Sequence, residues 1–594
     1  MHPTEYRARI LLDVLRVVVL PAAVLSLYLQ SSGTQLGLWS LPCHAAFIFI
    51  WMYTRCLYSD WIQSRDARRL GAKPIPRVVG KLPGNIDVLY KMMKAFKSSY
   101  ILDVYLELFQ EYQCTTLNAR ILWVDQIITM DEEHSKFVIA TGFHHFWRGK
   151  LQKERMERFL GNGIFNRDDE IWKTHRSMAR PFFARERISD FELYEKHAQR
   201  LLSIVSSTAS SDLACDAQDL YSRFTMDSAS EFLFGENFDT LSGARPEPGK
   251  ATLGAKGSAL TDHFGTFAQA FEECQQIITT RARLGYTWPL HELWEDKTVK
   301  PVQRIRQWLD PIVQRVLDDK ARMRKAEIQS PVGEKNFLQH LADSTEDPSL
   351  IRDQLLSMLL AARDTTACLL TFVTYFMAMH PEVTRRLRAE VVHHCGPTGA
   401  PTYDTIRNLR YMRAVIHETL RLFPPVPLNI RESRAAACAL PPADGTYSGT
   451  LLPTQPLYMP PRTNIVYLPL LTQRNPALWG PDADNFDPGR WLDAERLSRY
   501  TSNPMMYTPF SAGPRACVGQ NYALNEAMYL LVRLVQQVER VELVPECQPG
   551  GSLPPVEWKG RKGRQAYERV WPAAALTLYA KGGLWVRFGQ TGST

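Results

Sequence analysis

Cysteine is scarce in this chain, and the cysteines that occur do not cluster. The 594 residues include ten cysteines, scattered from Cys43 to Cys547, with no Cys-x-x-C pair and no Cys/His group. Such spacing argues against a disulfide-stapled secreted domain and against a zinc site. We expect reduced cysteines on the cytosolic side, most of them acting as small buried hydrophobes, with one at most in a chemical role.

Long runs of one charge are also missing. The 70 Lys and Arg residues exceed the 62 Asp and Glu residues by a net charge of +8, which is spread along the chain without a basic arm. A nucleic acid partner is therefore not expected, and a membrane surface or an acidic docking partner fits better. Fractions of 45% hydrophobic and 22% charged residues exclude a disordered, collagen-like or many-span membrane protein.

The one long stretch without charge lies near the N-terminus. Residues 17–54 contain no Asp, Glu, Lys or Arg and divide at Ser31-Ser32-Gly33-Thr34 into two apolar runs. Residues 14–29 are interrupted by Arg16 and Pro21, whereas residues 36–53 are long enough for a membrane span and end in aromatic residues. The basic residues that follow favour a retained anchor over a cleaved signal peptide. Residues 1–70 are therefore predicted as a membrane anchor, either one span or a two-helix hairpin.

A Pro/Gly-rich segment, residues 71–85, follows the anchor and is predicted as a hinge, because its prolines forbid a continuous helix. No later linker divides the remainder, so residues 86–594 are expected to form one catalytic domain. Helical patterns dominate residues 100–425, and short strand-like pieces follow in residues 426–510 and near the C-terminus. The expected fold class is α+β and mostly helical, with small β-sheets.

One cysteine has a distinctive setting. Residues 510–519 read F-S-A-G-P-R-A-C-V-G and precede an apolar helical pattern from about Gln520 to Val538. Gly513 and Pro514 make a tight turn, and Gly519 allows close backbone approach. The following helix start points amide groups and a positive dipole end at the sulfur of Cys517, which favours a thiolate.

This loop resembles the haem loop of the cytochrome P450 superfamily, Phe-x-x-Gly-x-Arg-x-Cys-x-Gly, at every fixed position. The resemblance implies the cytochrome P450 fold and a bound haem b, iron protoporphyrin IX. By that resemblance Cys517 is the axial ligand of the haem iron, Arg515 contacts a haem propionate and Phe510 packs beside the sulfur. A thiolate ligand favours cleavage of the O–O bond of bound oxygen.

Three further motifs occur in the family's chain order. Glu418-x-x-Arg421 places a carboxylate and a guanidinium on one face of a helix, where an exposed ion pair would contribute little. The later segment F-D-P-G-R-W resembles the part of the family that adds a third charged partner, here Arg490. The resemblance implies a buried network of Glu418, Arg421 and Arg490 that supports the haem loop.

The second motif, A-A-R-D-T-T at residues 361–366, lies within an apolar run from about Asp353 to His380. A threonine here can bond back to a preceding carbonyl and bend the helix. By resemblance Thr365 is the oxygen-activating alcohol and Asp364 its acidic neighbour in a proton relay. Ala362 departs from the family pattern, which has glycine at this position, and its methyl group could narrow the oxygen pocket.

The third motif, Trp172-Lys-Thr-His-Arg176, matches the family's Trp-x-x-x-Arg, whose Trp and Arg bond to haem propionates. Without the other motifs it would be an ordinary cation–π pair. Arg431, in N-I-R, is a further expected propionate partner, because burying two propionates without cations is costly.

The resemblance implies a monooxygenase that inserts one atom of O2 into a C–H bond of a lipophilic substrate. No Gly-rich nucleotide fingerprint or flavin domain occurs, so the expected electron source is NADPH through a separate NADPH-cytochrome P450 reductase, with cytochrome b5 as a further partner. We expect an endoplasmic reticulum membrane location with the catalytic domain facing the cytosol.

The substrate prediction depends on which residues occupy the variable positions of these motifs. A-A-R-D-T-T-A, V-P-L-N-I-R and the loop after Phe510 look most similar to the fungal alkane and fatty-acid hydroxylase branch, which oxidises terminal or near-terminal carbons of long chains. Two alternatives stay open: a secondary-metabolite hydroxylase acting on a terpenoid or polyketide, and a haem-binding sensor or carrier without catalysis. Asp364 and Thr365 argue against a carrier, which has no use for a proton relay.

Overall fold

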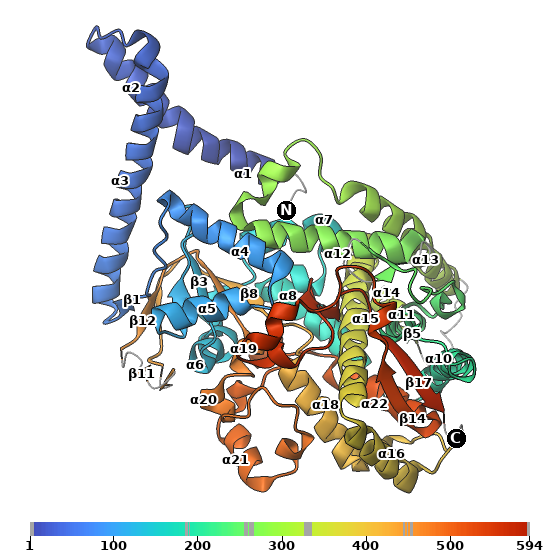
Figure 1. Cartoon of the computed structure of the whole chain (residues 1–594). Coiled ribbons are helices and arrows are strands. Elements are labelled where there is room, and N and C mark those ends of the chain that lie inside the picture. Colours follow the sequence, from blue (N-terminus) through green and yellow to red (C-terminus); the bar gives the residue numbers. More distant parts are fainter. Residues whose placement is uncertain are drawn as a thin grey trace.

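A bundle of long helices forms most of the molecule, and small sheets lie at its sides (Figure 1). The computed structural model describes residues 5–184, 188, 191–254, 259–260, 266–325, 335–443, 446–447, 450–451 and 455–590. The mostly helical α+β class predicted from the sequence is confirmed.

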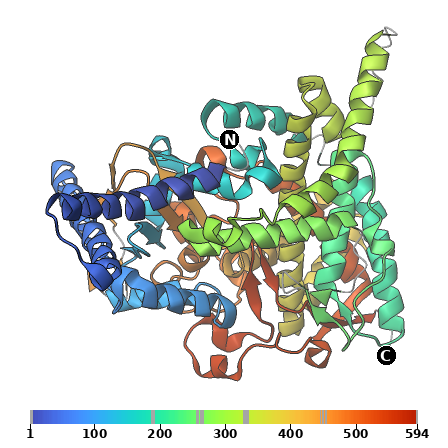
Figure 2. The same cartoon turned by 90° about the horizontal axis from the view of Figure 1, so that it is seen from above.

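The N-terminal segment forms a helical hairpin that stands away from the body (Figures 1 and 2). Its outgoing arm is α1 (Glu5–Val14), a π-helical turn (Leu15–Val19) and α2 (Leu20–Ser31), and its returning arm is α3 (Ser40–Arg69). The break between the arms coincides with the polar division at Ser31-Ser32-Gly33-Thr34.

The helices of the body are mostly amphipathic and pack around a central one, α15. In chain order they are α4 (Ile86–Ser98), α5 (Asp103–Tyr112), α6 (Glu132–Lys136), α7 (Lys150–Leu160), α8 (Asp169–Ala179), α10 (Glu192–Ser210), α11 (Ala217–Phe234), α12 (Thr266–Leu284), α13 (Val299–Lys325), α14 (Phe337–Ser344), α15 (Pro348–Met379), α16 (Pro381–Cys395), α17 (Tyr403–Asn408), α18 (Arg410–Leu422), α19 (Pro469–Thr472), α20 (Pro476–Trp479), α21 (Ala494–Ser502) and α22 (Gln520–Gln537). The bounds of α15, α18 and α22 lie close to those predicted from the sequence.

Two apolar helices in the described part of the chain are long enough to cross a membrane, residues 6–31 and α15. Of these two helices, α15 is mostly buried in the body, whereas residues 6–31 present their apolar surface outward. Helix α3, which contains most of the run that the sequence favoured as a span, residues 36–53, is not among them. A membrane span at this run stays a prediction. Helix α3 begins at Ser40, inside the run, and continues into residues 55–69, where several arginines lower its hydropathy.

The largest sheet joins residues that are far apart in the chain. Its strand order is β2 (Thr116–Asn118), β3 (Gln126–Thr129), β13 (Asn464–Tyr467), β8 (Asn429–Ser433) and β4 (Phe146–Trp147). Strands β3 and β13 pair in parallel and the other neighbours pair antiparallel. Three of these strands, β2, β3 and β4, lie within residues 100–425, where the sequence indicated helices. Strands β3 and β4 pair with β13 and β8, some 300 residues later, so local patterning does not reveal them.

The remaining sheets are smaller. β1 (Lys73–Pro74), β12 (Leu457–Met459) and β9 (Cys438–Leu440) form one three-stranded sheet, and β14 (Val538–Leu543), β17 (Trp585–Gln590) and β5 (Cys215–Asp216) form another. β15 (Pro572–Ala574) and β16 (Leu578–Ala580) form a hairpin. Four further strands make two short pairs, β6 (Thr252–Leu253) with β7 (Ala259–Leu260) and β10 (Thr446–Tyr447) with β11 (Thr450–Leu451).

The segment predicted as a hinge, residues 71–85, is paired with the body at several points. The backbone N–H of Lys73 donates to the carbonyl of Pro456 at 2.8 Å, and β1 pairs with β12. Farther along, Val78 and Pro76 exchange backbone hydrogen bonds with Asn118. These bonds fix the path of the chain between α3 and the body.

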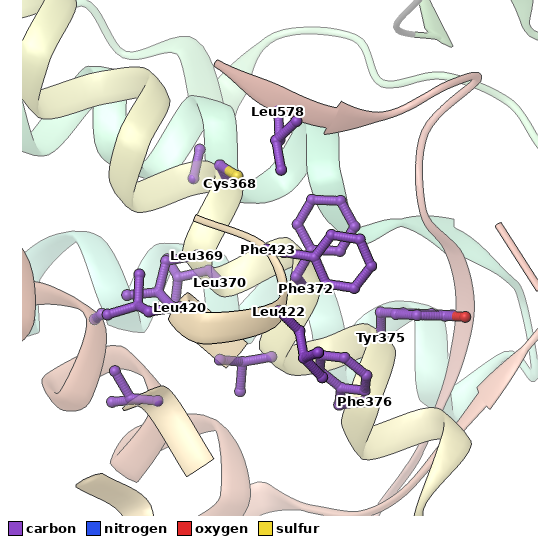
Figure 3. Close-up of a cluster of buried hydrophobic side chains, with 14 of the residues drawn as sticks. Cys368, Leu369, Leu370, Phe372, Tyr375, Phe376, Leu420, Leu422, Phe423 and Leu578 are labelled. Carbon is purple, nitrogen blue, oxygen red and sulfur yellow. The ribbon is translucent and has the colours of Figure 1, made fainter. Parts of the chain in front are cut away.

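Aromatic side chains fill the core between α15 and α18, as Figure 3 shows. The rings of Phe372 and Phe423 stack with centroids 4.2 Å apart, and Phe376 stacks on Phe486 at 3.8 Å. Burial of several such rings stabilises the body by roughly 1.5–3 kcal/mol for each side chain. This core fixes α15 and α18, the two helices that carry the second and first predicted motifs.

Candidate active site

A tight loop before α22 carries Cys517. The backbone N–H of Cys517 donates to the carbonyl of Phe510 at 2.9 Å, which closes the loop over a 3₁₀ turn, Gly513–Arg515. Gly513 has a φ of +68°, and a Cβ there would lie 2.0 Å from the carbonyl oxygen of Ile139, so only glycine fits. Phe510 is half-buried and packs against the main core.

Gly519 is the N-cap residue of α22, and the close backbone approach predicted at this position stays a prediction. A Cβ there would meet only the ring of Phe183 at 3.5 Å, an ordinary contact, so nothing in the described protein forbids a side chain at this position. Its backbone N–H instead acts on Cys517, because a hydrogen bond from this N–H stabilises the thiolate.

The Cys517 residue is exposed on one side, and protein atoms lie close to the sulfur on its other sides. Burial raises the pKa of the Cys517 thiol, whereas the N–H of Gly519 and the guanidinium of Arg176 lower it. Seven of the other nine cysteines have a pKa raised chiefly by burial. All nine are partly or fully covered, so Cys517 is the exposed thiol among the ten. An accessible sulfur at a helix start suits metal ligation.

Several arginines converge on one side of this loop from different elements. Burial and the positive charge of Arg431 lower the pKa of Arg148 to about 9 and that of Arg515 to about 10. Arg515 lies over the ring of Trp172, with 4.4 Å between its guanidinium carbon and the ring centroid. Burial also lowers the pKa of Arg176, one helical turn from Trp172. These cations raise one another's free energy, so the group favours anions.

One carboxylate partly compensates this positive charge. Asp168 accepts hydrogen bonds from Arg515 at 2.7 Å, from the backbone N–H of Arg148 at 2.8 Å and from Lys153 at 2.8 Å. Among the described residues it is the one carboxylate in ion-pair distance of the arginine group. The buried Nε atoms of Arg148 and Arg431 have no hydrogen-bond acceptor within the protein.

This surplus of buried positive charge tests whether haem fits the site. Haem carries two propionates, and a carboxylate pairs well with a guanidinium whose N–H groups are unsatisfied. An accessible thiol, the buried Arg431, the half-buried Arg148 and Arg515, and two unsatisfied Nε atoms match a ligand to the iron and partners for two acid groups. The residues present therefore fit the cofactor that the sequence predicted.

The structure brings Glu418, Arg421 and Arg490 together. Arg421 donates to both oxygens of Glu418 at 2.8 Å, and Nε of Arg490 lies 3.5 Å from the same carboxylate. Glu418 and Arg421 are both fully buried. The indole N–H of Trp491 and the backbone N–H of Asp487 also donate to Glu418.

Arg421 extends this network to the backbone. Its guanidinium donates to the carbonyl oxygens of Gln473, Ala483 and Asn485 at 2.6 to 3.0 Å. Gln473 in turn accepts a hydrogen bond from the backbone N–H of Thr508, two residues before Phe510. A chain of hydrogen bonds thus joins α18 to the start of the cysteine loop.

Helix α15 carries the predicted relay residues without a break in its α-helical hydrogen bonding. The hydroxyl of Thr365 donates to the carbonyl of Ala361 at 2.7 Å, one turn earlier. Thr365 is half-buried, and Asp364 is buried with Arg363 3.6 Å away. The back-bonding that the sequence indicated is present, and α15 keeps its α-helical hydrogen bonding there without a π-helical widening.

Two residues with a place in this site were missed by sequence reasoning. Arg148 stands in W-R-G-K, where nothing marks one arginine as buried. Glu526 is fully buried in α22. Burial raises its pKa to about 8, although hydrogen bonds from Ser228, Thr366 and Tyr522 act to lower it. A single Glu in an otherwise apolar helical pattern was the available signal for the second.

The chain is similar to known proteins over most of its length. The family model described as Cytochrome P450 matches residues 83–554. The chain is 33% identical over 496 residues to "Cytochrome P450 52E2" of Candida apicola, covering 83% of this chain and 90% of the relative. It is 34% identical over 501 residues to "Cytochrome P450 monooxygenase himC" of Aspergillus japonicus, with 82% of each chain covered.

A solved structure shows the same fold. The "Crystal structure of cytochrome P450DA heme domain" superposes with a TM-score of 0.63 at 18% identity, covering 88% of this chain and 98% of that one. At this identity the likeness concerns the fold alone.

Proposed function

The chain belongs to the cytochrome P450 family of haem-dependent monooxygenases, and from this premise we propose that it hydroxylates a long-chain fatty acid or alkane at a terminal or near-terminal carbon. Haem held by a cysteine thiolate supplies the activation of O2, so that one oxygen atom enters a C–H bond and the other leaves as water. The observation that carries this proposal is the accessible thiol of Cys517 beside a buried surplus of guanidinium groups.

The residues of the chain have separate tasks in this reaction. Cys517 would hold the iron, and Arg148, Arg431, Arg515 and Arg176 with Trp172 would hold the propionates. Thr365 and Asp364, both on α15, would deliver protons to the reacting oxygen. The network of Glu418, Arg421 and Arg490 would keep the cysteine loop in place without touching the substrate.

The electrons come from a redox partner, as in the family. We propose NADPH through a membrane-bound NADPH-cytochrome P450 reductase, because the sequence holds no flavin or nucleotide fingerprint. The net charge of +8 suits an acidic docking partner. The apolar helix of residues 6–31 supports attachment to the endoplasmic reticulum membrane with the body in the cytosol.

The lipid substrate is supported by the motif wording around residues 361–367 and 510–527, and by relatives of the 52 group, "Cytochrome P450 52E2" and "Cytochrome P450 52A9" of Candida maltosa. A terpenoid or polyketide is the second candidate, because the chain is equally similar to himC, whose name does not place it in that group.

Product analysis tests this proposal. The full chain with recombinant reductase and NADPH is offered fatty acids, alkanes, terpenoids and polyketides, and the products are identified by mass spectrometry. Hydroxylated fatty acids or alkanes are the expected result. Oxidation of the terpenoid or polyketide set alone would replace the lipid substrate, and haem binding without any product or substrate-induced spectral shift would leave only a carrier.

The ligand assignment has its own test. We expect Cys517→Ala to lose the thiolate-type spectrum of the reduced CO complex, because no other described cysteine lies in an accessible loop at a helix start. The matched control is Cys547→Ala, which alters a half-buried cysteine far along the chain from this loop. A thiolate-type spectrum in Cys517→Ala would show that another group binds the iron.

A further inference from the structure

The first helix of the chain is docked on the catalytic body. Tyr6 is only 1% exposed, its ring lies 4.7 Å from that of Trp288, and its hydroxyl donates to the carbonyl of Glu292 at 3.1 Å. The next turn adds Ile10, which is buried. We call this contact of α1 with residues 286–294 and α7 the N-terminal latch.

Ionic contacts reinforce the latch. Arg9 donates to Glu154 of α7 at 2.8 and 3.2 Å and lies over the ring of Tyr286, with 4.5 Å to its centroid. The hydroxyl of Tyr286 donates to Asp13 at 2.5 Å. Buried aromatic packing together with a bidentate ion pair makes this a specific contact between α1 and the body.

The returning arm is attached to the body as well. Ala67, at the end of α3, and Ala72 are buried against Tyr458 of β12, and β1 continues directly into pairing with that strand. Asp60 of α3 forms ion pairs with Arg77 and Arg120 at 2.9 and 2.5 Å. Figures 1 and 2 show both arms meeting the body while the turn between them points away.

Between these two attachments the hairpin presents apolar side chains to its surroundings. Residues 6–31 have a mean hydropathy of 2.3 in their most apolar window, of which 11% is buried. Large exposed side chains cover both arms: Leu11, Leu12, Val14, Leu15, Val18, Val19, Leu20, Val24, Leu27, Leu41, Phe49, Ile50, Tyr53 and Leu57. An apolar surface of this extent on a helix pair suits the hydrocarbon of a lipid bilayer.

Polar groups at the turn of the hairpin and between its arms have hydrogen-bond partners within the hairpin. The hydroxyls of Ser31 and Ser32 donate to the carbonyls of Tyr28 and Leu29, and Ser26 on one arm bonds His44 on the other at 2.9 Å. In a bilayer, polar groups without water must find partners within the protein. The turn and the interface between the arms meet this requirement.

We propose that the anchor is a helical hairpin that enters and leaves the bilayer from the same face, so that the N-terminus lies on the catalytic side. This rests on the membrane attachment in the proposed function. A single span would place the first residues across roughly 30 Å of hydrocarbon from the body, where Tyr6 and Arg9 could not reach Trp288 and Glu154.

The charges that flank the apolar arms agree with this topology. Arg7, Arg9 and Arg16 precede the charge-free stretch, and Arg55, Arg65, Arg68 and Arg69 follow it. Positive flanks remain on the cytosolic side, so basic residues at both ends favour a hairpin over a span that would carry one group across.

Protease protection of the full chain in sealed microsomes tests the topology. Epitopes without basic residues are placed before Met1 and after Thr594, and a lumenal protein reports whether the vesicles are closed. A protease of broad specificity, which cleaves within the epitopes themselves, should remove both of them without detergent. An N-terminal epitope that is protected until detergent is added would overturn the hairpin and leave the membrane anchor and the enzyme reaction intact. Recovery of the intact chain in the soluble fraction would overturn both the hairpin and the anchor.

Tryptic release of the N-terminal epitope in the same vesicles tests the latch, since trypsin cleaves after Arg7 and Arg9. Tyr6→Ala and Glu154→Arg should each release it several-fold faster than the unchanged chain. The charge swap Arg9→Glu with Glu154→Arg should restore slow cleavage after Arg7. Ala8→Ser, at an exposed position of the same helix, is the matched control. Equal rates for all variants would show that α1 is not held on the body.

Discussion

At the residue scale, the most informative feature is a set of like charges held together away from solvent. The set consists of Arg148 in a loop, Arg431 in a strand and Arg515 in a 3₁₀ turn. Burial lowers the pKa of Arg148 and of Arg515, and the positive charge of Arg431 lowers both pKa values further. A protein has no reason to bury repelling cations for stability alone. Their arrangement beside an accessible thiol therefore indicates an anionic group that they hold.

Removing one of these cations should separate cofactor binding from stability. Hydrogen bonds to charged groups contribute about 1.5–3 kcal/mol, so Arg148→Gln should weaken haem binding roughly 10- to 100-fold. The apoprotein should not lose stability, because the substitution also removes repulsion with Arg431 and Arg515. Haem titration and thermal unfolding of the apoprotein measure the two effects, with the exposed Arg180→Gln as control. Unchanged haem affinity would contradict the assignment.

Glu526 should make stability depend on pH. Burial raises its pKa to about 8 in the folded protein, above the value of about 4.3 expected when unfolded, so the folded state holds a proton that the unfolded state has lost between these values. The contribution is full below about pH 4 and falls by about 1.4 kcal/mol per pH unit as the pH rises toward 8.

The neutral variant Glu526→Gln removes this dependence. At matched haem content its thermal midpoint should exceed that of the unchanged protein at pH 8 by more than at pH 5.5. The exposed Glu557→Gln serves as control. A difference that is the same at both pH values would mean that Glu526 is ionised in the folded protein.

At the scale of elements, α18 and the segment that contains Arg490 act together as a support for the cysteine loop. The carboxylate of Glu418 accepts hydrogen bonds from four residues, and Arg421 donates to three backbone carbonyls. Such a network stabilises only when every member is satisfied. Its loss should therefore affect a loop that it does not touch directly.

Arg421→Ala leaves the buried Glu418 without its main partner. We expect a loss of about 3–5 kcal/mol in the free energy of unfolding and poor haem retention, because an uncompensated charge stays in the core. The comparison is Lys173→Ala, which breaks the exposed i, i+3 pair with Glu170 and should change the free energy of unfolding far less. Denaturant unfolding of both variants measures the contrast, and equal small losses would refute the supporting role.

Helix α15 offers a matched pair of threonines. Thr365 and Thr371 each donate to the carbonyl four residues earlier at 2.7 Å, but Thr365 is half-buried at the predicted oxygen site and Thr371 lies fully in the core. Thr365→Ala should keep haem binding while more of the NADPH consumed yields peroxide. Thr371→Ala should change stability and leave the peroxide fraction unaltered. The ratio of peroxide to NADPH measures this, and equal ratios in both variants would remove the relay role of Thr365.

At the scale of the whole molecule, the anchor and the body form one structure. The hairpin covers Trp288 at one end and Tyr458 at the other. Removing it should therefore change both membrane binding and the stability of the enzyme.

A chain that lacks residues 1–70 should move largely from membranes to the soluble fraction. It should also unfold at a lower temperature, because burial of a side chain such as Tyr6 contributes roughly 1.5–3 kcal/mol. A chain that lacks only residues 1–4 is the control. Ultracentrifugation and thermal unfolding at matched haem content are the measurements. A truncated chain that stays wholly with membranes would show that the hairpin is not the sole anchor.

The sequence by itself determined the motifs and the helices that carry them. Strongly periodic segments such as α15, α18 and α22 were predictable because their patterns are local, and Cys517 was marked by fixed spacing in a short loop. The sequence also determined that residues 17–54 are free of charge.

Only the tertiary structure decided what depends on distant contacts. Strands β3 and β4 need partners some 300 residues later, Arg148 becomes part of a cation group only when four elements meet, and Glu526 is recognisable as protonated only from its burial. The path of the N-terminus depends on Tyr6 meeting Trp288 across most of the first half of the chain. The physical reason is the same in each case: burial and charge coupling belong to the folded arrangement, whereas periodicity and spacing belong to the chain.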